Sequence, residues 1–287
     1  MTLLHVAREA AELVKFPHTL FALPFALISM LAAAQGLPRW SVLGLILLAM
    51  VGARTAAMAF NRIADEQIDA HNPRTANRAL PAGRLHRSFA LAMVIIGAAV
   101  LVGAAWALNP LCLALAPLAL AWLLAYSYSK RFTALSHLWL GASLGLAPVG
   151  AWLAVRGSLA APPLVLMAAV TAWVAGFDVL YSLQDEAFDR SWGLRSLVVR
   201  LGAKRAIVVA RLLHGGAAVG FAVFAWLVSA GWGLWVGVAA AVALLVWQHS
   251  IVGPGRLERL DTAFFTANGA LSVLMFVLYL LDMIGRA

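Results

Sequence analysis

Nine long apolar stretches constrain the fold of this chain more than any other feature of its sequence. Each is long enough to cross roughly 30 Å of hydrocarbon as a helix. With 63% apolar and 11% charged residues and a mean hydropathy of +0.90, the chain is too hydrophobic for a soluble domain. We therefore predict an all-α polytopic membrane protein, with about nine transmembrane helices in one bundle. The predicted spans are 17–35, 41–61, 88–107, 110–127, 134–154, 164–185, 206–228, 231–249 and 263–283.

We interpret residues 1–287 as a single domain. Its first residues mix Arg8, Glu9, Glu12 and Lys15 with apolar side chains, which is unlike a cleavable signal sequence. An interfacial helix over residues 1–16, leading into the first span, fits this pattern better.

The distribution of basic residues predicts the orientation in the membrane. The formal net charge is +9, but the basic residues lie in short loops between apolar stretches, so we do not expect nucleic-acid binding. Of the 21 Lys and Arg residues, all but Arg39, Arg156 and Arg286 lie at the N-terminus, in the even-numbered connections or nearest those ends. The positive-inside rule then places the N-terminus in the cytoplasm. Cys112 is the single cysteine, so the chain has no internal disulfide.

Two acidic motifs end long apolar stretches, and both would lie on the cytoplasmic side. On a helix, residues four apart share a face, so each motif forms a polar stripe. Carboxylates near hydrocarbon are costly, and Mg²⁺ prefers one or two of them together with phosphate oxygens. The two stripes, brought together between two halves of the bundle, predict a site for a Mg²⁺-bound diphosphate; alternatively, the acids only solvate helix ends. The stripes are Asn61, Asp65 and Asp69, and Asp178, Tyr181, Asp185 and Asp189.

Basic residues near these motifs could contact phosphate oxygens. The candidates are Arg74, Arg78, Lys130 and Arg131, since arginine offers a planar fork and lysine a point charge. For each one, the alternative is a residue that only fixes topology. Tyr126 and Lys130 are expected to share a helix face at the end of a span.

Arg54 lies seven residues before Asn61, about two helical turns deeper and on nearly the same face. An arginine inside a membrane helix needs a partner or an anionic ligand. We favour the carboxylate of an aromatic acid as that ligand. A structural ion pair, with Asp178 as the partner, is the alternative.

These motifs closely resemble the UbiA superfamily of intramembrane prenyltransferases. The family has an Asn-Asp-x-x-Asp-x-x-x-Asp motif, a later Asp-x-x-x-Asp motif and a Tyr-x-x-x-Lys element. Here Asn61-Arg-Ile-Ala-Asp65 and Gly176-Phe-Asp178-Val-Leu-Tyr181 look like the 4-hydroxybenzoate polyprenyltransferase branch. More narrowly, Lys15-Phe-Pro-His-Thr and Tyr128-Ser-Lys130-Arg-Phe-Thr look like relatives assigned to menaquinone synthesis through futalosine. Arg62 departs from the pattern, because the family usually has Asp there.

The resemblance implies a role for each matching residue. Asp65, Asp69, Asp185 and Asp189 would be catalytic by holding Mg²⁺, directly or through water. Arg74, Arg78, Lys130 and Arg195 would hold the diphosphate. Arg54 and Asn61 would face the aromatic acceptor, and Tyr126, Asp178 and Tyr181 complete the substrate-binding set.

The function expected from this resemblance is Mg²⁺-dependent transfer of a polyprenyl group from polyprenyl diphosphate to the ring of an aromatic acid, in quinone biosynthesis. The acceptor is 4-hydroxybenzoate or 1,4-dihydroxy-6-naphthoate, and the location is a bacterial cytoplasmic (inner) membrane. The competing hypothesis is a divalent-cation transporter or channel, which would place acids near the middle of the bilayer. The sequence leaves prenyl chain length and oligomeric state open.

Overall fold

The computed structural model describes Glu9, Leu13, residues 19–253 and residues 255–286. These residues form helices joined by short connections, with no β-strand among them. Eight of the described helices are long and apolar enough to cross a membrane, and Phe21–Ala34 is a shorter apolar helix. The predicted all-α polytopic fold with about nine spans is therefore confirmed.

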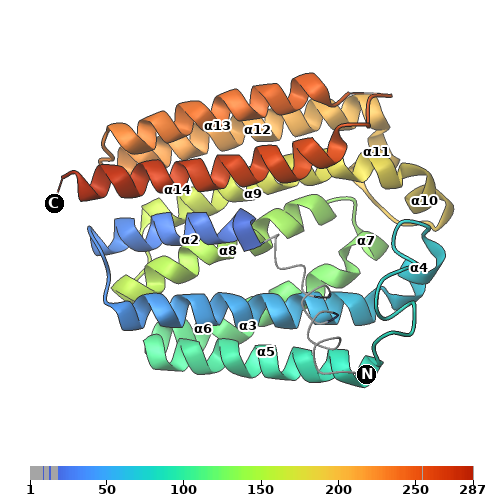
Figure 1. Ribbon diagram of the computed structural model, residues 1–287, viewed down its shortest axis with the longest axis horizontal. Coiled ribbons are helices and arrows are strands. Elements are labelled where there is room, and N and C mark those ends of the chain that lie inside the picture. Colours follow the sequence, from blue (N-terminus) through green and yellow to red (C-terminus); the bar gives the residue numbers. More distant parts are fainter. Residues whose placement is uncertain (1–8, 10–12, 14–18, 254, 287) are drawn as a thin grey trace. The chain divides into compact units, whose positions relative to one another are not determined.

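Contacts divide the chain into two compact units. Figure 1 labels the helices of both. Among the described residues, the first contains Glu9, Leu13, Thr19 and everything from Trp40 to Tyr128. Two long helices, α3 and α5, make most of its internal packing. Its elements are α3 (Trp40–Ala64), α4 (Glu66–His71), α5 (Arg87–Leu108), α6 (Pro110–Ala125) and the 3-10 helix η2 (Tyr126–Tyr128).

Glycine allows the backbones of α3 and α5 to touch. A Cβ atom on Gly52 would lie 2.7 Å from the carbonyl oxygen of Gly97, and one on Gly97 would lie 2.6 Å from the backbone nitrogen of Ala56. No side chain fits at either position. Small residues permit such close helix packing in membranes, where van der Waals contact drives association.

The turn between α5 and α6 separates two spans that the sequence leaves hard to tell apart. Asn109 caps α6, since its Oδ1 accepts a hydrogen bond of 2.9 Å from the backbone nitrogen of Cys112. Pro110 occupies the first helical position, where its missing N–H has no cost.

The second unit contains residues 20–39 and the chain from Ser129 onward. Helix α9 is its core: Val170, Trp173 and Val174 are fully buried, because α8 and α12 pack on either side. The elements are α2 (Thr19–Ala34), α7 (Ser129–Phe132), α8 (Ser136–Arg156), α9 (Ala161–Tyr181), η3 (Ser182–Asp185), α10 (Glu186–Ser191), α11 (Leu197–Leu201), α12 (Ala203–Leu227), α13 (Trp232–Ile251), η4 (Thr262–Ala267) and α14 (Asn268–Ile284).

Most of the interfacial helix predicted over residues 1–16 lies outside the described residues. Glu9 and Leu13 are described, and both are buried. Glu9 accepts hydrogen bonds of 3.0 and 3.1 Å from Nε of Arg84. Leu13 packs in an apolar cluster with Ala59 and Leu80. These two residues are therefore tied to the loop that follows the first acidic motif.

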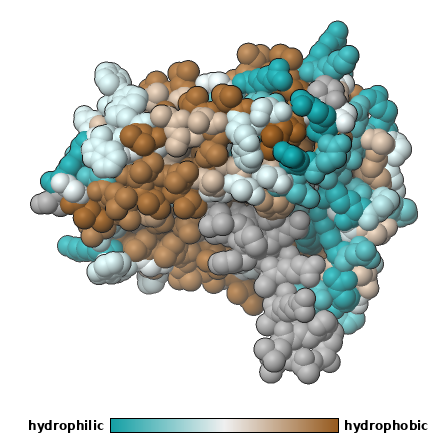
Figure 2. Space-filling model, turned by 45° about the horizontal axis from the view of Figure 1, so that its top comes forward, coloured by the Kyte–Doolittle hydropathy of each residue, from teal (hydrophilic) through white to brown (hydrophobic). Residues whose placement is uncertain are grey.

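The surface is apolar over the spans. Large side chains such as Ile95, Trp106, Leu212 and Trp226 are exposed, which suits contact with lipid. Figure 2 shows a broad apolar area in the middle of one face, with hydrophilic side chains gathered mainly toward its right-hand side.

Candidate active site

The first acidic motif lies where α3 breaks. Helix α3 ends at Ala64, and α4 begins at Glu66. Asp65 between them has φ −100° and ψ 6°, in the sparsely populated bridge region where many active-site residues lie. The continuous helix predicted through this motif is therefore interrupted at Asp65. Hydrogen bonds four residues apart continue, however, from the Asp65 N–H to the Asn61 carbonyl and from the Asp69 N–H to the Asp65 carbonyl.

Polar side chains of this motif contact one another within the first unit. Nδ2 of Asn61 donates to Oδ2 of Asp65 at 2.9 Å. The buried carboxylate of Asp69 accepts a 2.6 Å hydrogen bond from Arg78. Arg62 is also buried and lies 3.9 Å from the same oxygen of Asp69. Two guanidinium groups thus compensate one carboxylate.

The second acidic motif lies at a similar break in the second unit. Helix α9 ends at Tyr181, the 3-10 helix η3 follows, and α10 begins at Glu186. Asp185 at the junction has φ −97° and ψ 0°, close to the values of Asp65. The predicted regular α-helical stripe is again interrupted, because the tighter 3-10 turn has about three residues per turn rather than 3.6. Both motifs place their central aspartate at the start of a short helix.

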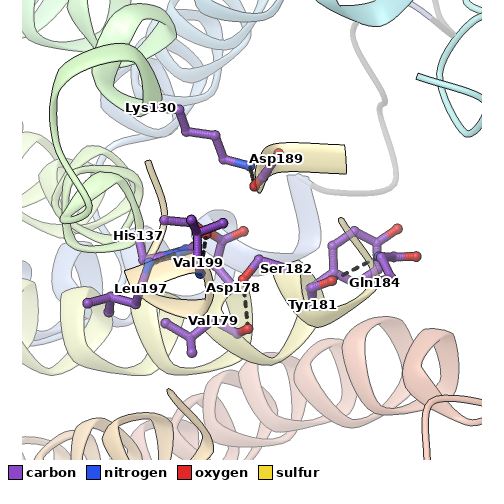
Figure 3. A network of polar contacts seen from close by, with 11 residues as sticks. Lys130, His137, Asp178, Val179, Tyr181, Ser182, Gln184, Asp189, Leu197 and Val199 are labelled. Carbon is purple, nitrogen blue, oxygen red and sulfur yellow. Dashed lines mark hydrogen bonds and ion pairs between the residues drawn. The ribbon is translucent and has the colours of Figure 1, made fainter. Parts of the chain in front are cut away.

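Lys130 faces the second motif from α7 (Figure 3). Its Nζ donates to Oδ2 of the buried Asp189 at 3.4 Å. The Arg195 backbone N–H donates to the Lys130 carbonyl at 2.7 Å, and the Arg195 guanidinium donates to the Phe132 carbonyl at 2.7 Å. The loop that carries Arg195 therefore holds α7, and with it Lys130, beside Asp189.

Asp178 is held by a buried histidine. Nδ1 of His137, which is fully buried at the start of α8, lies 2.6 Å from Oδ2 of Asp178 (Figure 3). The backbone N–H of Leu197 donates to Nε2 of the same ring at 3.4 Å. A ring nitrogen that accepts a hydrogen bond carries no proton. The proton of a neutral His137 thus lies on Nδ1 and is donated to Asp178.

A cluster of aromatic side chains lies next to Tyr181. The ring of Phe264 packs against that of Tyr181 with centroids 4.1 Å apart and the ring planes tilted by 33°, and it also contacts Phe177 and Phe21. Phe264 lies in η4, a π-helical turn, and such turns are frequent at functional sites. The Asn268 side chain supports this turn by donating to the Ala263 and Phe264 carbonyls.

The other predicted site residues occupy expected positions along the chain. Arg54 and Asn61 belong to α3, Arg74 follows α4, and Tyr126 is in η2. Tyr126 lies in η2 and Lys130 in α7, which follows directly, so the shared face predicted for them stays a prediction. The two motifs belong to different units, so their meeting at one site stays a prediction. Among the described residues, no three His, Cys, Asp or Glu side chains cluster as a metal site would.

The sequence profile of the UbiA prenyltransferase family matches residues 22–276. The chain belongs to this family. It is accordingly an integral membrane prenyltransferase, an enzyme that transfers alkyl or aryl groups.

Curated relatives agree with this family. The chain is similar to the 4-hydroxybenzoate octaprenyltransferase of Alkalilimnicola ehrlichii, with 32% identity over 88% of this chain and 85% of that protein. It is also similar to the 4-hydroxybenzoate octaprenyltransferase of Salmonella paratyphi B, with 30% identity over 82% of this chain and 81% of that protein.

Solved UbiA structures share the fold. A UbiA homologue from Aeropyrum pernix, solved in its apo form, is 35% identical, covers 93% of this chain and 98% of its own, and has a TM-score of 0.85. A UbiA homologue from Archaeoglobus fulgidus, solved with DMAPP and Mg²⁺, has a TM-score of 0.75 at 19% identity, over 97% of this chain and all of its own. Because the chain belongs to a family of prenyltransferases, the competing hypothesis of a divalent-cation transporter or channel is no longer supported.

The sequence did not single out two residues that contact predicted site residues, His137 beside Asp178 and Phe264 beside Tyr181. His137 was one of seven scattered histidines, and its position at a helix start carries no motif. Phe264 lies in a generic apolar stretch, and no residue pattern marks a π turn. Both act through contacts with residues far away in the chain, so the printed sequence offers no signal that could have found them.

Proposed function

We propose that this UbiA enzyme transfers a polyprenyl group from polyprenyl diphosphate to a ring carbon of an aromatic acid, in quinone biosynthesis. The proposed acceptors are 4-hydroxybenzoate, which the names of the curated relatives support, and 1,4-dihydroxy-6-naphthoate, which the Lys15–Thr19 and Tyr128–Thr133 segments support. We further propose a bacterial inner membrane as its location, with the N-terminus in the cytoplasm.

One observation carries the proposal: each acidic motif has a basic side chain bound to one of its carboxylates. Arg78 pairs with Asp69 at 2.6 Å, and Lys130 pairs with Asp189 at 3.4 Å. A metal-bound diphosphate supplies a cation for the carboxylates and oxygen acceptors for the basic groups. Binding would therefore exchange partners, with Arg78 and Lys130 turning to phosphate oxygens. Arg74 and Arg195 would add further contacts to the diphosphate.

The donor set fits Mg²⁺. Hard cations prefer oxygen ligands, and Mg²⁺ in proteins uses one or two carboxylates with water and substrate phosphates. Asp65 and Asp69 in one motif, and Asp185 and Asp189 in the other, supply such ligands. When bound, the ion would supply charge neutralisation for the departing diphosphate. The two Archaeoglobus fulgidus complexes with a prenyl diphosphate and Mg²⁺ support this ligand class for the fold.

The protein residues would then promote departure and addition. Arg78 and Lys130 stabilise the negative charge that develops on diphosphate as the allylic C–O bond breaks, with its electron pair leaving on oxygen. The apolar helices keep water from the allylic cation. A ring carbon activated by the phenol oxygen attacks C1 of the prenyl chain, and loss of the ring proton restores aromaticity. Positioning of the two substrates contributes much of the acceleration.

The remaining site residues would orient the acceptor. Arg54 would bind its carboxylate, and Asn61 would lie beside its ring. Asp178, held by His137, and Tyr181 are the residues of the second motif that could contact its phenol. Tyr126 would lie near the prenyl diphosphate.

The test is prenyl transfer by purified protein in lipid, with Mg²⁺ or EDTA, one polyprenyl diphosphate, and either aromatic acid. Product mass identifies the acceptor. We expect a prenylated product that forms with Mg²⁺ and disappears with EDTA. A folded protein that prenylates neither acid would contradict the acceptor assignment, and equal turnover with EDTA would contradict the role of Mg²⁺.

A further inference from the structure

The second unit contains a cavity at the end remote from its acidic motif. Its volume is about 440 Å³, and it lies among the C-terminal ends of α2, α8, α12 and α14 and the start of α9. Pro162 of α9 lines it, whereas Tyr181 at the far end of α9 precedes Asp185. Nineteen residues of helix separate the two, or roughly 30 Å. In Figure 1, α10 and α11 lie at the opposite side from the C-terminus.

Buried polar atoms in this lining lack hydrogen bonds. Asp282 is 2% exposed, and neither of its carboxylate oxygens accepts a hydrogen bond from a described residue. Trp152 is 8% exposed, and its Nε1–H likewise has no acceptor in the described part of the chain. Buried polar groups in native proteins are almost always satisfied, by protein or by something bound. Oδ1 of Asp282 has the Arg286 guanidinium beside it, but Oδ2 of Asp282 and Nε1 of Trp152 have neither a hydrogen bond nor an ion pair with a described residue. These two atoms at one cavity indicate an occupant that the chain does not supply.

Two arginines define the charge of the occupant. Arg286 lies beside Asp282, with Nε 3.2 Å from Oδ1, and its NH1 donates to the Ser229 carbonyl at 3.4 Å. Arg156 lines the same cavity and has no carboxylate partner among the residues that the structure describes. The lining therefore offers guanidinium groups to an anion and a carboxylate to a cation with N–H donors. A ligand with both groups close together matches this lining.

The position of the cavity favours a lipid. The residues that line it lie at the ends of helices that can span the membrane, where lipid headgroups meet protein. Apolar side chains, such as those of Leu227 and Met283, also line it. A cavity of this volume is far larger than the ~30 Å³ share of one water and falls in the range of ligand sites.

We propose that this cavity binds the phosphoethanolamine headgroup of an aminophospholipid. Arg156 and Arg286 bind the phosphate, since guanidinium groups suit phosphate oxygens. The primary ammonium binds the carboxylate of Asp282, and Trp152 donates to a headgroup oxygen. Phosphatidylcholine has no N–H donor for Asp282, and phosphatidylglycerol has no cation, so both should bind less well.

Native mass spectrometry of the purified full chain tests this proposal. The protein is exchanged into phosphatidylethanolamine, phosphatidylcholine or phosphatidylglycerol with identical acyl chains, and retained lipid is counted. We expect about tenfold greater retention of phosphatidylethanolamine, the equivalent of one charge-assisted hydrogen bond. Asp282→Asn and Trp152→Phe should each reduce that preference. Arg39→Gln, which removes an exposed arginine outside the lining of this cavity, is the matched control.

Each outcome decides the proposal. Equal retention of the three lipids, or full preference in both Asp282→Asn and Trp152→Phe, would overturn it. Soluble phosphoethanolamine is added as a competitor: displacement of the lipid at millimolar concentration would assign the site to the soluble compound rather than the membrane. Prenyl transfer by each variant reports that the protein is folded, because the cavity lies far from the second acidic motif. If Asp282→Asn fails to fold, the lipid preference of Trp152→Phe alone tests the proposal.

Discussion

At the scale of single residues, the two acidic motifs have the same construction. Each central aspartate lies in the bridge region of backbone conformation, at φ near −100° and ψ near 0°. Each last aspartate is buried against a basic side chain, Arg78 for Asp69 and Lys130 for Asp189. Buried carboxylates are costly unless they are paired. Charge compensation therefore allows the motifs to exist before any ligand arrives.

The central aspartates provide the first prediction. Asp65→Asn and Asp185→Asn should each reduce turnover at least ~100-fold, the usual loss when one electrostatic stabiliser of a transition state is removed. The assay is product formation at saturating Mg²⁺. Glu186→Gln is the matched control, since Glu186 adjoins Asp185 but pairs with Arg190 at 2.9 Å. Substantial activity in either Asn variant would refute the metal assignment.

The second prediction concerns Arg54. Arg54→Ala should raise the KM for the aromatic acid by about tenfold or more, because a charge-assisted hydrogen bond to the carboxylate is lost. The KM for polyprenyl diphosphate should change far less. Steady-state kinetics with each substrate varied in turn measures both values. Equal increases would show that Arg54 does not select the acceptor.

His137 provides the third prediction. His137→Phe removes the donor that orients Asp178, and we expect kcat to fall about tenfold while the KM for polyprenyl diphosphate stays constant. His137→Gln, whose amide can still donate, should recover part of the loss. Thermal unfolding of both variants separates orientation from packing. If Gln and Phe are equally inactive at equal stability, the hydrogen bond does not matter.

At the scale of elements, the apolar stretches predicted the spans well. The structure places helices at Trp40–Ala64, Arg87–Leu108 and Trp232–Ile251, within a few residues of the expected ranges. Length and hydropathy suffice, because a membrane helix must satisfy its own backbone. The 3-10 turn η3 and the π turn η4 were missed. The Asn268 side chain that supports η4 accepts a hydrogen bond from Nε1 of Trp173, 95 residues away, and spacing along the chain does not encode such a contact.

The fourth prediction tests the π turn. Asn268 is fully buried and accepts from Trp173 Nε1 at 2.9 Å while donating to two carbonyls of η4. Asn268→Leu leaves these buried groups unsatisfied, at a cost of about 1–3 kcal/mol each. We expect the apparent Tm in detergent to fall by at least ~5 °C. Ser250→Ala, at an exposed hydroxyl, should leave it unchanged; an unchanged Tm for Asn268→Leu would mean that the amide does not support the turn.

At the scale of the whole molecule, the sequence predicted the membrane fold and both acidic motifs. It also identified Arg78 and Lys130 as basic residues near those motifs, and each contacts an aspartate in the structure. The meeting of the two motifs at one site depends on how the halves of the bundle assemble. Periodicity within a helix carries no information on that assembly, so this part stays a prediction.

The orientation in the membrane provides the fifth prediction. In a Cys112→Ala background, a membrane-impermeant maleimide added to intact spheroplasts should label Ser158→Cys, in the loop between α8 and α9. Ser191→Cys, at the end of α10, should react only after permeabilisation. Both positions are exposed, and the positive-inside rule places them on opposite sides. The reverse pattern would invert the topology.

The close approach of α3 and α5 at Gly52 and Gly97 leaves no room for a side chain between the two backbones. Gly52 lies 13 residues before Asp65, or about 20 Å along the helix axis. A side chain at either glycine would push the two backbones apart and shift or tilt α3. The end of α3 next to Asp65 would move with it. A methyl group added at Gly52, remote from every polar residue of the motif, would therefore misplace the first aspartate. In a screen for inactive enzymes, Gly52→Ala would therefore have the same effect as replacing one of the aspartates proposed to hold Mg²⁺.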